Sequence, residues 1–153
     1  MSWDPTGPKR TRPDRNIANA IGDYLRSAWP ELSSFSDVWV TGSHVWRFLY
    51  GEEPRAGADL DLIVCDQGMV SAVLDAISPL LIEPPADAKP TTSMGGRKFY
   101  TSRGNVDVWI NADVFDALRG YTARTHGHCR AAYQPKYRQL VVIDNSGPVA
   151  DDI

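Results

Sequence analysis

The segment Asp59–Val64 alternates acidic and apolar side chains before it becomes wholly apolar, and this alternation constrains the fold more than any other feature. Successive side chains of a β-strand point to opposite faces of a sheet. The pattern predicts a strand over Leu60–Cys65 whose core-facing side chains are Leu60, Leu62 and Val64. Asp59 and Asp61 are then directed to the other face, with Cα atoms about 6.5 Å apart.

A single acid interrupts a second apolar strand, predicted over Asn105–Ile110. Its apolar residues Val106, Val108 and Ile110 share one face, and Asp107 lies on the other face with Trp109. If the two strands pair, cross-strand neighbours are about 4.5–5.5 Å apart and three carboxylates meet on one face. Like-charge repulsion makes such a cluster unfavourable, and a divalent cation relieves it. A lone Asp-x-Asp would be an ordinary solvent face of an edge strand, but Asp107 favours the cluster.

A Gly-Ser turn supplies the third element. Gly42-Ser43 follows a predicted strand, Val38–Thr41, and precedes a predicted short helix, His44–Tyr50. Backbone N–H groups at a helix N-terminus attract anions such as a triphosphate. The turn alone would be a routine helix cap. The order strand, Gly-Ser, helix, loop, Asp-x-Asp strand and later acid is much less common by chance.

The other predicted elements surround these motifs. The first are an amphipathic helix from Ile17 ending at Trp29-Pro30, a helix over Met69–Ile77 and a breaker-rich loop over Glu83–Gly96. A strand over Arg97–Ser102 follows and is joined to Asn105–Ile110 through Arg103-Gly104. The last are a short helix, capped by Asn111 or Asp113 and ending near Arg119, and a closing hairpin of His128–Tyr133 and Arg138–Ile143. Strands alternate with helices early and form hairpins late. This order predicts an α+β (mixed α/β) fold: one mixed sheet with flanking helices and a C-terminal β-hairpin.

The chain has 153 residues, a length that predicts one domain. We expect a flexible basic arm over residues 1–13, a single domain over 14–146 and a tail over 147–153. Helix-breaking residues flank a basic run here, and we interpret the segment as a solvated tail rather than a contact with phosphate or RNA (Pro5, Gly7, Pro8, Pro13; Lys9, Arg10, Arg12, Arg15).

Charge and composition exclude some classes of binding partner and indicate the cellular compartment of the protein. The formal net charge of −3 argues against a protein that coats nucleic acid electrostatically. No apolar run approaches the roughly 18 residues that cross a bilayer, so no membrane association is expected. The first residues lack the apolar stretch of a signal peptide, and Cys65 and Cys129 are too few for a disulfide scaffold. These features predict a cytoplasmic location.

With these motifs the chain resembles the nucleotidyltransferase superfamily that includes DNA polymerase β, the small antitoxin-type nucleotidyltransferases and the aminoglycoside nucleotidyltransferases. The matching segments are Val40-Thr41-Gly42-Ser43, Asp59-Leu60-Asp61-Leu62 and Asp107, and the resemblance covers residues 37–111. Three departures are a long spacer after Ser43, Trp46 where small members often carry Arg, and Ala58 where Ser is frequent.

The resemblance implies that Asp59 and Asp61 bind two Mg²⁺ (or Mn²⁺) ions. Asp107 would help to bind the ion that activates the attacking hydroxyl and could take up its proton. Gly42 and Ser43 would hold the β- and γ-phosphates. The implied reaction is transfer of an NMP from an NTP, with ATP expected, to a hydroxyl acceptor with release of pyrophosphate.

The acceptor stays open among a tRNA end, a protein hydroxyl, a small molecule and a nucleotide. The alternative is a non-catalytic or regulatory protein of the same fold, antitoxin-like, that binds a nucleotide or a toxin-type or other protein partner. A third interpretation is a nucleic-acid module that uses the basic arm.

Other chemistries have weaker support. His126, His128 and Cys129 suggest zinc, but the remaining Cys and His residues, Cys65 and His44, are distant in sequence. Neither a Gly-x-Ser-x-Gly motif nor a P-loop occurs. The basic residues near the acids are interpreted as surface charges rather than phosphate ligands, and the neighbouring aromatic residues as packing rather than base-stacking groups (Arg55, Arg97, Lys98; Tyr100, Trp109).

Overall fold

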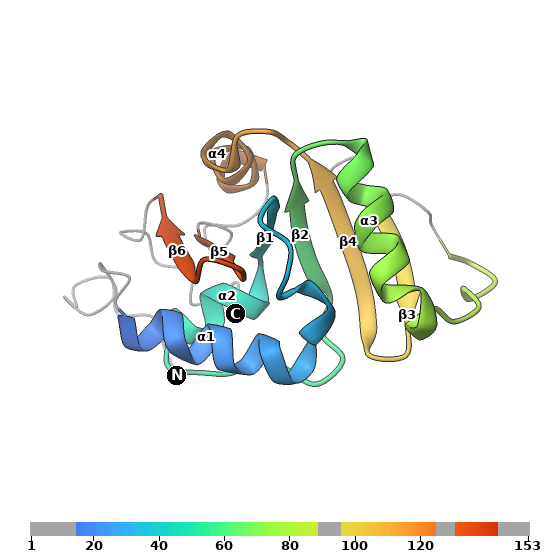
Figure 1. Ribbon diagram of the computed structural model, residues 1–153, viewed down its shortest axis with the longest axis horizontal. Helices are drawn as coiled ribbons and strands as arrows, with labels where there is room; N and C mark the ends of the chain where they lie inside the picture. Colours follow the sequence, from blue (N-terminus) through green and yellow to red (C-terminus); the bar gives the residue numbers. More distant parts are fainter. Residues whose placement is uncertain (1–14, 89–95, 125–130, 144–153) are drawn as a thin grey trace.

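Four α-helices and two short 3-10 helices are present in the computed structural model, which describes residues 15–88, 96–124 and 131–143 (Figure 1). They are α1 (Arg15–Ala28), η2 (Pro30–Leu32), α2 (Ser43–Leu49), α3 (Gln67–Ile77), η3 (Ser78–Leu80) and α4 (Val114–Arg124). The predicted arm, the predicted tail and the three residues of the zinc alternative (His126, His128, Cys129) lie outside the described residues. None of the described helices has both the length and the apolar character needed to cross a membrane.

The described strands form one six-stranded sheet with the order β3-β4-β2-β1-β5-β6. The strands are β1 (Val38–Thr41), β2 (Leu60–Val64), β3 (Arg97–Thr101), β4 (Gly104–Ile110), β5 (Ala131–Gln134) and β6 (Gln139–Val142). Among the described strands only β2 and β4 pair in parallel, and the other neighbours are antiparallel. The α+β class and the closing hairpin, β5–β6, are thus confirmed.

One face of the sheet carries the larger core. Leu60, Leu62 and Val64 of β2 are buried there, as the alternation predicted. Helices α1, α2 and α3 cover this face (Figure 1), and each adds buried apolar residues, among them Ile21, Val45 and Val73. Full burial of such a side chain contributes about 1.5–3 kcal/mol, so this core holds the three helices on the sheet.

The opposite face carries a smaller cluster under α4. Ile63 of β2 is buried there with Leu118 of α4, and Trp109 packs against them. The side chain of Asp113 caps α4 by accepting a hydrogen bond from the backbone N–H of Phe115 (2.9 Å), which confirms one of the two predicted caps. Asp61 precedes Ile63 by two residues, so it lies on this same face.

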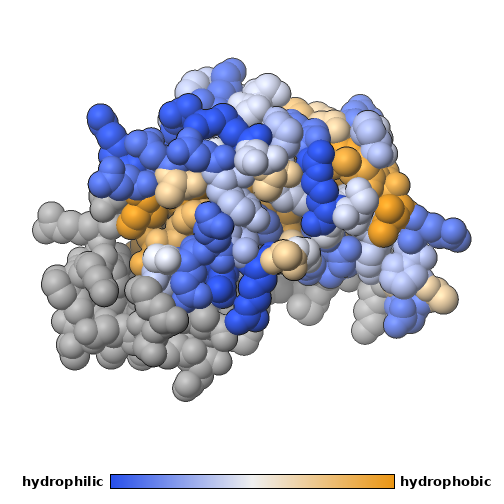
Figure 2. Space-filling model, turned by 90° about the horizontal axis from the view of Figure 1, so that it is seen from below, coloured by the Kyte–Doolittle hydropathy of each residue, from blue (hydrophilic) through white to orange (hydrophobic). Residues whose placement is uncertain are grey.

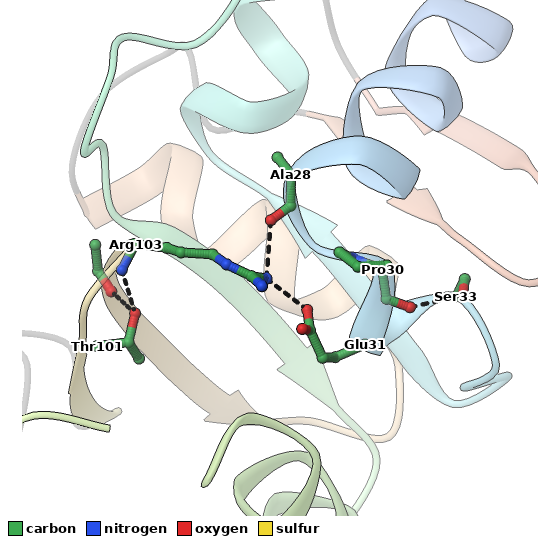
Figure 3. A network of polar contacts seen from close by, with 7 residues as sticks. Ala28, Pro30, Glu31, Ser33, Thr101 and Arg103 are labelled. Carbon is green, nitrogen blue, oxygen red and sulfur yellow. Dashed lines mark hydrogen bonds and ion pairs between the residues drawn. The ribbon is translucent and has the colours of Figure 1, made fainter. Parts of the chain in front are cut away.

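A polar network joins the β3–β4 turn to the end of α1 (Figure 3). Nη1 of Arg103 donates to the carbonyl oxygen of Ala28 (3.1 Å) and to Oε1 of Glu31 (2.7 Å). The turn itself is held by Thr101, whose Oγ1 accepts from the N–H of Arg103 (3.1 Å). The structure ends β3 at Thr101 and begins β4 at Gly104, so the turn is one residue earlier than predicted.

Candidate functional site

The three acids named by the sequence lie together. Asp61 of β2 is directly opposite Asp107 of β4 in the parallel register, and their side chains hydrogen-bond to each other. Asp59, just before β2, acts electrostatically on both. Asp107 is 6% exposed and Asp61 is partly buried. The strand pairing on which the predicted cluster depended is therefore present.

Burial and charge repulsion raise the pKa values of two acids in this cluster. Burial raises the pKa of Asp61 well above its usual range, and the negative charges of Asp107 and Asp59 raise it further. Burial also raises the pKa of Asp107, against the opposing effect of the Lys98 ammonium. The hydrogen bond between the two carboxyl groups raises the pKa of Asp61 and lowers that of Asp107. The pKa values of both carboxyl groups are therefore raised, and the two acids oppose each other's ionisation as a pair.

Lys98 supplies a positive charge that the sequence interpretation left on the surface. It is paired with Asp107 across β3 and β4. Its Nζ lies 3.5 Å from Oδ2 of Asp59 and 3.6 Å from Oδ1 of Asp107. Burial lowers the pKa of Lys98, but the carboxylates of Asp107 and Asp59 outweigh this effect and raise it. Lys98 thus remains charged and offsets part of the acidic repulsion.

The donor chemistry of the cluster suits a hard divalent cation, because Mg²⁺ prefers carboxylate oxygens. Within residues 15–88, 96–124 and 131–143, however, no group of three or more His, Cys, Asp or Glu side chains is arranged to hold a metal ion. Among these residues, the buried Oδ1 of Asp107 accepts no hydrogen bond and has only the longer ion pair with Lys98. Metal binding would have to overcome the raised pKa values of Asp61 and Asp107 and displace Lys98.

The Gly-Ser turn lies directly against the acids. Gly42 has φ +72° and ψ −151°, and an added Cβ would lie 2.1 Å from Oδ2 of Asp61. The preceding residue, Thr41, is paired with Asp61 across β1 and β2. Ser43 then begins α2 and is partly exposed. Glycine is required at position 42 both for the backbone conformation and for the close approach of the carboxyl group.

We expect Gly42→Ala to destabilise the protein by about 2–4 kcal/mol, because a strained backbone and an overlap with Asp61 add together. Gly57→Ala is the matched control, since Gly57 has φ +74° and no atom within 4 Å of an added Cβ. That variant should lose only about 1 kcal/mol, the backbone contribution. Urea denaturation of both variants measures the difference. Equal losses would contradict the contact between Gly42 and Asp61.

His44 connects the Gly-Ser turn to the first acid. It is 2% exposed, and its side chain hydrogen-bonds to the backbone of Asp59. Burial lowers the pKa of His44 to about 4, so the imidazole is neutral near pH 7. Arg47, one turn further along α2, holds the following loop by donating to the carbonyl oxygen of Glu53 and to Oε2 of Glu52, both at 2.7 Å. Helix α2 therefore positions the backbone that leads to the acids.

Acidification should destabilise the wild type through His44. Its folded-state pKa of about 4 lies below the unfolded value of 6.5, so stability is lost as the pH falls from 6.5 toward 4. We expect a loss of about 2 kcal/mol between pH 7 and pH 5 that His44→Gln lacks. Urea denaturation of both proteins at the two pH values measures it, and groups common to both cancel in the comparison. Identical pH dependence would contradict a buried neutral His44.

Lys98 and His44 are the two site residues that sequence reasoning missed. The position of Lys98 depends on the turn: a two-residue turn at Ser102-Arg103 places Lys98 opposite Asp107, whereas the predicted turn at Arg103-Gly104 does not. No sequence signal indicated His44, whose role depends on the packing of α2 against the loop.

The chain matches no protein-family model, and comparison with curated proteins and with solved structures finds no significant match.

Proposed function

We propose that this protein is a Mg²⁺- or Mn²⁺-dependent nucleotidyltransferase that transfers an NMP from an NTP to a hydroxyl acceptor and releases pyrophosphate. The observation that carries the proposal is the meeting of three separate sequence motifs. Gly42 lies against Asp61, Asp61 is in register with Asp107, and Asp59 is adjacent to both. Chance alternation in an edge strand would not bring the Gly-Ser turn and a third acid to the same place.

The roles follow from the chemistry of these groups. Asp59, Asp61 and Asp107 provide oxygen ligands, and a metal pair held there would stabilise both the attacking and the leaving oxygens. Asp107 accepts the proton of the attacking hydroxyl. Backbone N–H groups and the hydroxyl at Gly42 and Ser43 bind phosphate oxygens. Lys98, which pairs with Asp59 and Asp107, would be available to neutralise charge on the triphosphate if a metal took its place beside the acids.

Binding of a non-hydrolysable ATP analogue, measured by calorimetry with and without Mg²⁺, tests the nucleotide site without knowledge of the acceptor. The wild type should bind only with Mg²⁺, and Asp107→Asn should not bind. Asp75→Asn, on the exposed side of α3, is the control and should bind as the wild type does. Label transfer from α-³²P NTPs to RNA, protein and small-molecule hydroxyls then tests the reaction. Absence of Mg²⁺-dependent binding would sink the proposal.

One observation favours a second candidate, a non-catalytic protein of regulatory, antitoxin-like type. Lys98 already compensates Asp59 and Asp107 in the described arrangement, so the cluster has a counter-charge without metal. Such a protein would show no Mg²⁺-dependent binding of the ATP analogue and would form a stable complex with a toxin-type or other protein partner. The same calorimetric titration therefore separates the two candidates.

A further inference from the structure

A cavity lies beside the segment that leads to Asp59. It has a volume of about 340 Å³, within the range of small-molecule sites. Its walls come from α1, α2, the loop before β2 and the β3–β4 turn, and the residues are Tyr24, Ser27, Ala28, Trp29, His44, Arg55, Gly57, Ala58 and Arg103. Gly57 and Ala58 directly precede Asp59, so the cavity adjoins the acidic cluster without including any of its acids.

The charges of the cavity favour an anion. Two of its residues are arginines and none is acidic. Among the described residues Arg103 is paired with Glu31 through Nη1 alone, and Arg55 has no ion-pair partner. Arg55 is exposed and belongs to the turn in which its carbonyl oxygen accepts from the N–H of Ala58 (3.1 Å). The cavity therefore presents one uncompensated guanidinium and a second with free donors.

A buried nitrogen atom of His44 places a second requirement on the ligand of the cavity. His44 lines the cavity, and its Nδ1 is buried without a hydrogen-bond partner in the part of the chain that the structure describes. The ring contacts the backbone of Asp59, so the unpartnered Nδ1 is left to form a hydrogen bond with a ligand. A ligand hydroxyl would satisfy it. Tyr24, whose ring lies 6.0 Å from that of His44, adds a phenol beside this position.

The surroundings also suit a polar ligand. In Figure 1, α1 and the β3–β4 turn lie along the lower side of the molecule, and Figure 2 shows that side to be hydrophilic over much of its described surface. We propose that this cavity binds a small hydroxylated phosphate, of the sugar-phosphate class. The phosphate is held by Arg55 and Arg103, and a hydroxyl hydrogen-bonds to Nδ1 of His44. This proposal is independent of nucleotidyl transfer.

Calorimetric titration of the full-length protein with ribose 5-phosphate in EDTA tests the site. The wild type should bind, ribose alone should not, and Arg55→Gln should weaken binding about tenfold, as loss of one charged contact predicts. Arg119→Gln, exposed on α4 away from the cavity, should leave the affinity unchanged. Both arginines are exposed, so neither variant is expected to impair folding.

Three outcomes would overturn the cavity proposal. The first is absence of binding by the wild type at millimolar ribose 5-phosphate, and the second is equal weakening by both variants. The third is binding that needs Mg²⁺ and is lost in Asp61→Asn, which would place the probe at the acidic cluster. Binding in EDTA that Asp61→Asn retains supports the cavity, and that result stands whether or not the ATP analogue binds.

Discussion

Asp61→Asn is expected to abolish nucleotidyl transfer and, at the same time, to stabilise the metal-free protein. The proposed reaction loses a metal ligand, for which a decrease of about 10³-fold is expected, equivalent to about 4 kcal/mol of transition-state stabilisation. The stability gain has a separate cause. The pKa of Asp61 is raised by burial and by the charges of Asp107 and Asp59, so the folded state opposes its ionisation.

The direction in which stability changes with pH follows from the difference between the folded-state and unfolded-state pKa values of Asp61. For an acid whose folded-state pKa exceeds its unfolded value, the favourable contribution is present below the unfolded pKa and is lost as the pH rises through the folded one. Asn carries no such charge and still offers an N–H donor to Asp107. At pH 8 in EDTA we therefore expect Asp61→Asn to be about 1–3 kcal/mol more stable than the wild type.

Urea denaturation in EDTA at pH 5 and pH 8 measures this difference, and Mn²⁺ binding by electron paramagnetic resonance measures the metal site. The stability gain should be larger at pH 8. Asp75→Asn, exposed on α3, should change neither quantity. A variant that is less stable than the wild type at pH 8 would show that Asp61 is ionised and well compensated in the folded protein.

The fold follows from local patterns more readily than the site does. Alternation of Asp59–Val64 and of Val106–Ile110 places side chains on the correct faces, because a period of two leaves little ambiguity once one face is buried. The predicted ends of the helices and strands are less accurate than the predicted side-chain directions. The predicted helix at Met69 begins at Gln67, because the side chain of Asp66 caps it by accepting from the N–H of Met69 (2.9 Å).

The electrostatic state of the site was not predictable from the motifs. The motifs placed three acids together and implied a cation beside them. The positive charge that lies beside these acids in the structure is the ammonium group of Lys98, from a different strand. Its position depends on the register of the β3–β4 hairpin, which moves by two residues when the turn moves by one. The neutral state of His44 depends on burial between α2 and a loop, which no spacing in the chain reveals.

Lys98→Met should have opposite effects on the metal-free and metal-bound forms. Without metal, Asp59 and Asp107 lose the ammonium that lies 3.5 and 3.6 Å from them, and Asp107 is left largely buried. We expect a loss of about 1–3 kcal/mol in urea denaturation in EDTA, because a buried charge without its partner is costly. The methionine keeps most of the aliphatic length, so lost packing contributes little.

With metal, the same substitution removes a competing cation. Mn²⁺ should bind Lys98→Met about tenfold more tightly than the wild type, equivalent to about 1.4 kcal/mol, because the ion no longer displaces a tethered positive charge. Arg97→Met, the exposed neighbour on the other face of β3, is the matched control and should change neither stability nor Mn²⁺ affinity appreciably. If Lys98→Met loses stability while its Mn²⁺ affinity stays at the wild-type value, Lys98 is a structural counter-charge alone. A gain in Mn²⁺ affinity that accompanies the loss of stability means that the ammonium and the metal compete for the same carboxylates.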